Sequence, residues 1–142
     1  MVSTSSSKLK TLPRALLVAL LLALGVFVFM GAWVGVAVLS NGHAGWMVLL
    51  AALDAGVFLR MARMRPGRMR ARLALLATIA SIALGNWLVA ALPIARAMGL
   101  FPLETAQRIG PDFGWMLIRL GNTPVDWLWM VAALVLAMWF GR

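Results

Sequence analysis

The sequence lacks cysteine entirely, and it contains one histidine and only four acidic residues in a chain of 142. Without cysteine the chain cannot form a disulfide, a thiolate metal site, an iron–sulfur cluster or a cysteine nucleophile. The single histidine, His43, excludes a histidine-rich metal centre and a bis-histidine haem site. We therefore expect no metal and no cofactor.

Charge of either sign is also scarce. Charged residues make up 12% of the chain and hydrophobic residues 63%, whereas soluble domains carry about 25% charged residues. A core of single-domain size cannot bury that much apolar side chain, so the surrounding solvent has to be lipid. The composition predicts an all-α, multi-pass membrane protein.

Four apolar segments are candidates for membrane-spanning helices, because a helix needs about 20 residues to cross a hydrocarbon core of about 30 Å. We predict helices at about 15–39, 44–62, 72–97 and 124–141, forming one transmembrane domain over 15–142. Residues 1–14 form a basic, flexible cytoplasmic tail. A cleaved signal peptide is the less favoured alternative, since the first segment has 25 uncharged residues and a signal core has about 7–15.

The segment 102–121 is predicted to be amphipathic and to lie along the outer membrane interface, because its apolar residues recur at three- and four-residue spacing. Gly110-Pro111 should divide it into two short helices, since a proline inside a helix breaks the hydrogen-bond ladder. Thr123, Pro124 and Asp126 form a pattern close to a capping box, which predicts that the last helix begins at Pro124.

The arginines predict the orientation. Ten of the 13 cationic residues lie in the N-terminal tail, in the segment 60–72 or at position 142. The turn at 40–43 has no lysine or arginine. By the positive-inside rule, both termini and the arginine segment lie in the cytoplasm. The predicted location is a bacterial inner membrane.

Asp54 is the main candidate for a functional residue, because a carboxylate inside an apolar helix costs about 2.5–3.5 kcal/mol on insertion scales. Two interpretations remain open. Asp54 binds a proton or cation in a small transporter, or it is hydrogen-bonded to Thr78, Ser81 or a loop arginine at a similar depth. Asn86, also in the third segment, is expected to link helices as a polar contact.

Small residues at four-residue spacing predict where helices approach closely. Gly31 and Gly35 form such a pair on the first segment, and Ala77, Ser81 and Gly85 form a stripe on the third. Most of these stripes are expected to pack inside the bundle. A homodimer or partner surface is the alternative.

Six arginines surround the turn Pro66-Gly67, and they are expected to contact anionic lipid headgroups: Arg60, Arg63, Arg65, Arg68, Arg70 and Arg72. Nucleic-acid binding is not expected, because the segment has no aromatic residue that could stack on a base.

The sequence contains no catalytic motif and no pair of residues suited to acid–base or nucleophilic chemistry, so we expect no enzyme and no catalytic residue. The favoured hypothesis is a non-enzymatic accessory or scaffold subunit that packs against a larger membrane complex or against itself. The alternative is a small oligomeric transporter or channel that uses Asp54. A toxin-immunity protein is a weaker alternative.

Overall fold

A computed structural model describes residues 13–41 and 44–142, and it contains six helices with no strand among those residues. The predicted tail at 1–14, apart from its last two residues, and His43 lie outside the described part of the chain. The helices are α1 (Arg14–Leu39), α2 (Met47–Met61), α3 (Arg68–Met98), α4 (Pro102–Arg108), α5 (Pro111–Gly121) and α6 (Pro124–Gly141).

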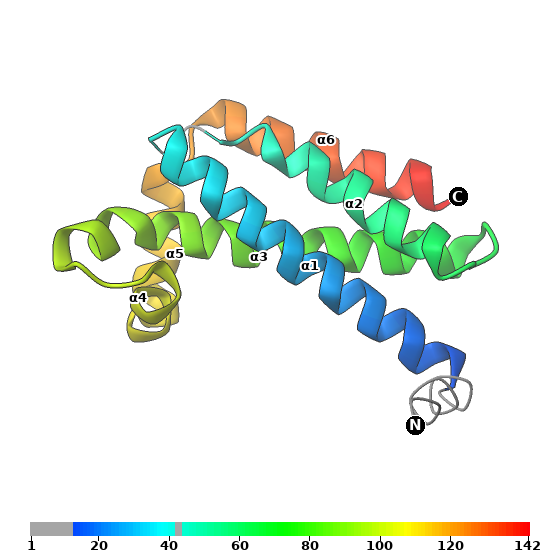
Figure 1. Ribbon diagram of the computed structural model, residues 1–142. Helices are drawn as coiled ribbons and strands as arrows, with labels where there is room; N and C mark the ends of the chain where they lie inside the picture. The colour runs from blue at the N-terminus through cyan, green and yellow to red at the C-terminus, as the bar shows by residue number, and fades with distance from the viewer. Residues whose placement is uncertain (1–12, 42–43) are drawn as a thin grey trace, which may run out of the picture.

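Four of the helices run side by side, and α4 and α5 lie across one end of them (Figure 1). Helices α1 and α6 each pack against both α2 and α3, which also pack against each other. Helix α3 contacts all five of the other helices. The start of α1, the loop between α2 and α3 and the end of α6 all lie at the end opposite α4 and α5 (Figure 1). We call this end the arginine-rich end, because it contains Arg14, Arg60, Arg63, Arg65 and Arg68. The opposite end, which contains α4 and α5, is called the hooked end.

Among the described residues, three helices are long and apolar enough to cross a membrane, namely α1, α3 and α6. The sequence predicts a fourth spanning helix at 44–62, but α2 has 15 residues and a length of about 22 Å. Residues 44–46 form a turn instead, in which the Met47 amide donates to the Ala44 carbonyl at 3.0 Å. At the other end Arg63 has a φ of 51°, which ends the helical path. The chain-reversing turns on both sides shorten the helix.

Helix α3 begins four residues earlier than predicted, at Arg68 instead of 72. The turn at Pro66-Gly67 is complete before Arg68, and arginine is a good helix former. Arg68 and Arg70, which lie before the predicted start of this helix, are therefore helical.

Local signals at the hooked end are confirmed. A helix lies on each side of Gly110-Pro111, since α4 ends at Arg108 and α5 begins at Pro111. The capping box is complete: the Thr123 amide donates to Asp126 Oδ2 at 2.8 Å, and the Asp126 amide donates to Thr123 Oγ1 at 3.4 Å. These contacts depend on neighbouring residues alone, which is why the sequence predicts them.

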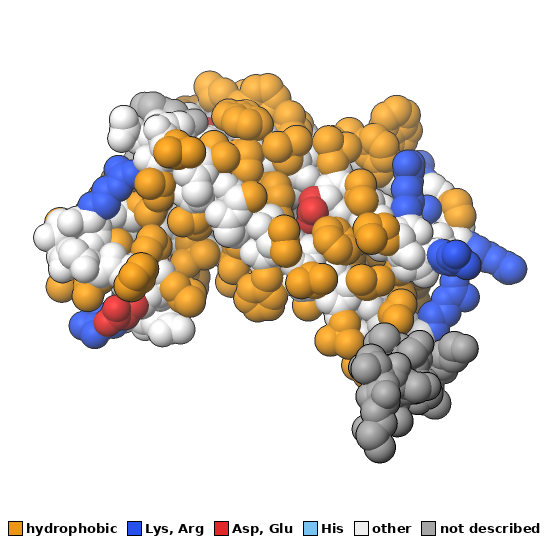
Figure 2. All heavy atoms as spheres, viewed as in Figure 1, with side chains coloured by type: hydrophobic (Ala, Val, Ile, Leu, Met, Phe, Trp, Pro, Cys, Tyr) orange, Lys and Arg blue, Asp and Glu red, His pale blue; other side chains and the backbone are white. Residues whose placement is uncertain are grey.

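The interior contains mostly small side chains, and many large apolar side chains face outward. Hydrophobic side chains cover the face between the two ends of the molecule, with cationic residues gathered at the arginine-rich end (Figure 2). Such a distribution is that of a protein whose solvent is lipid. The alanines that are 2% exposed or less are Ala37, Ala44, Ala51, Ala52, Ala74, Ala91, Ala95, Ala133 and Ala137.

Replacement of Gly85 by alanine should destabilise the protein, whereas the same change at Gly35 should not. A methyl group on Gly85 would collide with the Trp33 indole, and one on Gly35 would meet no atom within 4 Å. We expect Gly85→Ala to lower the free energy of unfolding by about 1–3 kcal/mol. Gly35→Ala should be neutral, or stabilising by up to about 1 kcal/mol. Unfolding by sodium dodecyl sulfate, followed by circular dichroism, measures the stability of both variants. Equal effects of the two substitutions would contradict the close contact between Gly85 and Trp33.

Candidate functional site

Asp54 lies at the midpoint of α2, seven residues from each end of the helix. The residue is half-buried. An acidic side chain is visible among hydrophobic ones midway along the face formed by α1 and α2 (Figure 2). Within residues 13–41 and 44–142, no hydrogen bond or ion pair to the Asp54 carboxylate is formed.

The partners that the sequence suggests for Asp54 are engaged elsewhere or lie inside the bundle. Thr78 is fully buried, and its hydroxyl donates to the Ala74 carbonyl of its own helix at 2.8 Å. Ser81 is also buried, at 2% exposure. The described loop arginines form no ion pair with Asp54. The carboxylate therefore lacks a partner among the described residues.

Asp54 borders the side of α2 that packs against α1. Four residues along the helix, the Phe58 ring lies against Gly25 of α1. On the other side of Asp54, Leu50 and Val57 are exposed. One turn of helix separates Asp54 from Phe58, so Asp54 lies on the edge of α2 that is next to α1.

Of the two sets of small residues at four-residue spacing, the one on α3 is buried and the one on α1 is exposed. Ala77, Ser81 and Gly85 are buried on α3, where Gly85 lies beneath the Trp33 ring. Gly31 and Gly35 are exposed, and no atom lies within 4 Å of the position that a side chain would take at either. The expectation that most small stripes serve the bundle thus holds for α3, while the pair on α1 is uncovered.

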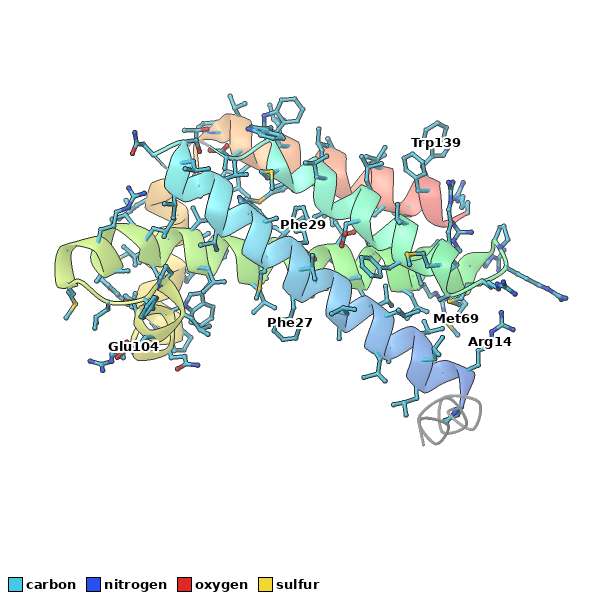
Figure 3. The ribbon with its side chains drawn as sticks, viewed as in Figure 1. Arg14, Phe27, Phe29, Met69, Glu104 and Trp139 are labelled. Carbon is cyan, nitrogen blue, oxygen red and sulfur yellow. The ribbon has the colours of Figure 1, made fainter. Side chains whose placement is uncertain are left out.

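Gly31 and Gly35 belong to a continuous apolar strip on α1 that points away from the bundle. Phe27, on this strip, points outward, whereas Phe29 points in between the helices (Figure 3). We call this strip the outer face of α1, and its residues are Leu20, Leu24, Phe27, Gly31, Gly35 and Val38.

Asn86 links α3 to the end of α5. It is 8% exposed, and its Oδ1 accepts from Asn122 Nδ2 at 3.2 Å. Two cavities meet at Asn86. One is a cleft of about 400 Å³ that is also lined by Asn41, Asn122 and Asp126. The other is a groove of about 450 Å³ between α3, α5 and α6. Apart from Asn86 its lining is apolar, and it includes Trp87, Trp115 and Trp127. Asn86 is thus a polar contact between helices at the boundary of these cavities.

The arginines differ in their surroundings. Arg60, Arg63, Arg65, Arg68 and Arg72 are exposed at the arginine-rich end, whereas Arg70 is 5% exposed. The sequence predicts the same contact with anionic lipid headgroups for Arg70 as for the other arginines. Arg70 lies four residues before the buried Ala74 and therefore on the same, inward face of α3. This spacing is visible in the sequence and could have indicated that Arg70 is buried.

Two cationic residues at the hooked end also have protein partners. Arg96 donates to the Val38 carbonyl at 2.8 Å, at the C-terminal end of α1, where a cation is favoured by the helix dipole. Arg108 forms an ion pair at 2.7 Å with Glu104, four residues before it in α4.

In the part of the chain that the structure describes, no group of three or more histidine, cysteine or acidic residues is arranged to hold a metal ion. No protein-family model, curated protein or solved structure matches the chain.

The Asn86–Asn122 hydrogen bond should contribute measurably to stability. A double-mutant cycle with Asn86→Leu and Asn122→Leu separates this pair from the bond that Asn122 makes to the Ile118 carbonyl. We expect a coupling energy of about 0.6 kcal/mol, with an upper bound of about 1.7 kcal/mol. Detergent unfolding measures it, and strictly additive effects of the two substitutions would show that the pair is not coupled.

Proposed function

We propose that this protein is a non-enzymatic accessory subunit that packs against a larger membrane protein through the outer face of α1 and Asp54. The observation that carries the proposal is the uncovered pair Gly31 and Gly35. Small residues let a second helix approach closely, and such packing drives helix association in lipid.

Asp54 favours a partner other than a second copy of this chain. A carboxylate at membrane depth is normally paired with a cation or a hydrogen-bond donor. The segments 15–39, 73–95 and 127–140 contain no lysine or arginine, so a second copy has no cation to offer at the depth of Asp54. We infer a partner helix with a cationic or hydrogen-bond-donating side chain near the middle of the membrane.

The proposed topology is a four-helix transmembrane bundle in a bacterial inner membrane, with both termini in the cytoplasm. Helix α1 ends at the hooked end and α3 begins at the arginine-rich end, and this supports a crossing by α2 despite its 15 residues. The concentration of arginine at one end supports the orientation, because positive residues are retained on the cytoplasmic side. The interfacial position of α4 and α5 is part of the same proposal.

The absence of cysteine makes the topology directly testable. We expect Arg65→Cys to react with a membrane-impermeant maleimide only after cells are permeabilised, and Gln107→Cys to react in intact spheroplasts. Both side chains are exposed, at opposite ends of the molecule. The unmodified chain has no thiol and is the control. The reverse labelling pattern would contradict the proposed orientation, and labelling of both sites from one side would contradict the crossing by α3, which lies between them.

Substitutions on the outer face of α1 should release the partner. We expect Gly31→Leu with Gly35→Leu to lower co-purification from native membranes at least tenfold, because the added side chains keep the second helix at a distance. Ala132→Leu is the matched control, since Ala132 is exposed on α6. Quantitative mass spectrometry of the purified complex measures the loss.

The identity of the captured protein decides the proposal. It should contain a membrane segment with a central lysine, arginine or other donor. We expect Asp54→Asn to weaken the complex, and replacement of that partner residue by leucine should weaken it as well. A pure homodimer broken by the α1 substitutions would instead make a second copy the partner. A complex that survives these substitutions would contradict the role of α1.

The alternative function is a small oligomeric transporter or channel in which Asp54 binds the transported proton or cation. The missing protein partner of Asp54 is the observation that favours it. Flux in reconstituted liposomes that is abolished by Asp54→Asn would support this alternative. The accessory role predicts no flux with the native chain or with Asp54→Asn.

A further inference from the structure

A pocket at the arginine-rich end lies where the end of α2, the start of α3 and the end of α6 meet. Its volume is about 290 Å³. Three of its lining residues are cationic, two are aromatic and one is proline: Arg60, Arg70, Arg142, Trp139, Phe140 and Pro66.

Arg70 is the buried cation of this pocket. Its side chain is 5% exposed, and one terminal nitrogen donates a long hydrogen bond of 3.4 Å to the Phe140 carbonyl. Its Nε is buried without an acceptor among the described residues. A buried charged group that lacks a partner is costly, so the position calls for an acceptor with negative charge.

The surroundings of Arg70 add positive charge and do not neutralise it. The Arg60 guanidinium lies over the Phe140 ring, at 5.9 Å from the ring centre. Arg142 lies on the rim of the same pocket. In residues 13–41 and 44–142 the one ion pair is that of Arg108 with Glu104, at the hooked end. The pocket is thus lined by three arginines, and no carboxylate among the described residues forms an ion pair with them.

Two features indicate the chemistry of the missing anion. The planar guanidinium group matches the oxygens of a phosphate, and it forms paired, charge-assisted hydrogen bonds to them. Trp139 is 72% exposed beside the pocket and points away from the bundle (Figure 3). A tryptophan in this position is typical of the headgroup level of a membrane, where acyl chains would pass its ring.

We propose that Arg60, Arg70 and Arg142 bind one phosphate group in this pocket, supplied by the headgroup of an anionic phospholipid or by a soluble phosphate. The lipid source rests on the proposed placement of the arginine-rich end at the inner membrane surface. The site does not depend on the accessory role of α1. The site differs from the diffuse attraction of a cationic loop to a membrane, because the arginines that line the pocket should contribute more to the binding affinity than the arginines outside it.

The test compares pocket arginines with an arginine of the same end that lies outside the pocket. The full-length chain in detergent is titrated with phosphatidylglycerol, and bound lipid is counted by native mass spectrometry. We expect Arg70→Gln and Arg60→Gln each to weaken binding about tenfold, the loss of one charge-assisted hydrogen bond. Arg65→Gln is the matched control, since Arg65 is exposed and does not line the pocket, and it should change the affinity less than about twofold.

Two further ligands identify the source of the phosphate. Phosphatidylcholine should bind much more weakly than phosphatidylglycerol, because its headgroup carries a compensating positive charge. Inorganic phosphate that displaces phosphatidylglycerol would assign the site to a soluble anion, and a lack of displacement would assign it to the lipid.

Equal losses of phosphatidylglycerol affinity in Arg60→Gln, Arg65→Gln and Arg70→Gln would contradict the proposed phosphate site. Equal binding of the two lipids would contradict it as well. Arg60 is exposed, so its variant remains informative if Arg70→Gln does not fold. A failed lipid result leaves the co-purification result on α1 unaffected, so the two proposals can fail separately.

Discussion

The structure depends on close contact between helices at small residues. In lipid the burial of large apolar side chains brings no gain over contact with acyl chains, so helices associate where their backbones can approach. Gly85 lies beneath the Trp33 ring, and Gly141 of α6 lies against the backbone of Ala71 on α3. Alanines complete the interior on the other helices. The thin, well-packed core follows from this requirement.

Helix α3 is the element on which these contacts converge, and its inward stripe also places the polar residues. Arg70, Ala74, Ser81 and Gly85 follow one another along the buried side of the helix. Asn86, next to Gly85, lies near the hooked end and bonds to Asn122. One face of one helix therefore positions a buried cation near one end of the bundle and a buried amide toward the other.

The polar residues divide into those whose partners lie within the chain and those without such partners. Thr78, Arg96 and Asp126 each have a hydrogen bond inside the protein. Asp54 and the Nε of Arg70 have none among the described residues. These two groups, together with the outer face of α1, are the features that the fold itself leaves unexplained. We propose that each of them has a contact outside the chain.

The sequence by itself determined the helical class, three helices long and apolar enough to cross a membrane, the break at Gly110-Pro111 and the capped start of α6. These features depend on composition or on residues within one turn of each other. The length of α2 was predicted wrongly, because its ends depend on how the chain reverses against neighbouring helices. Only the tertiary structure decided that Gly85 lies inside while Gly31 and Gly35 face outward, and that Arg70 is buried. Spacing along a helix shows which residues share a face, but the packing of the other helices determines which face is covered.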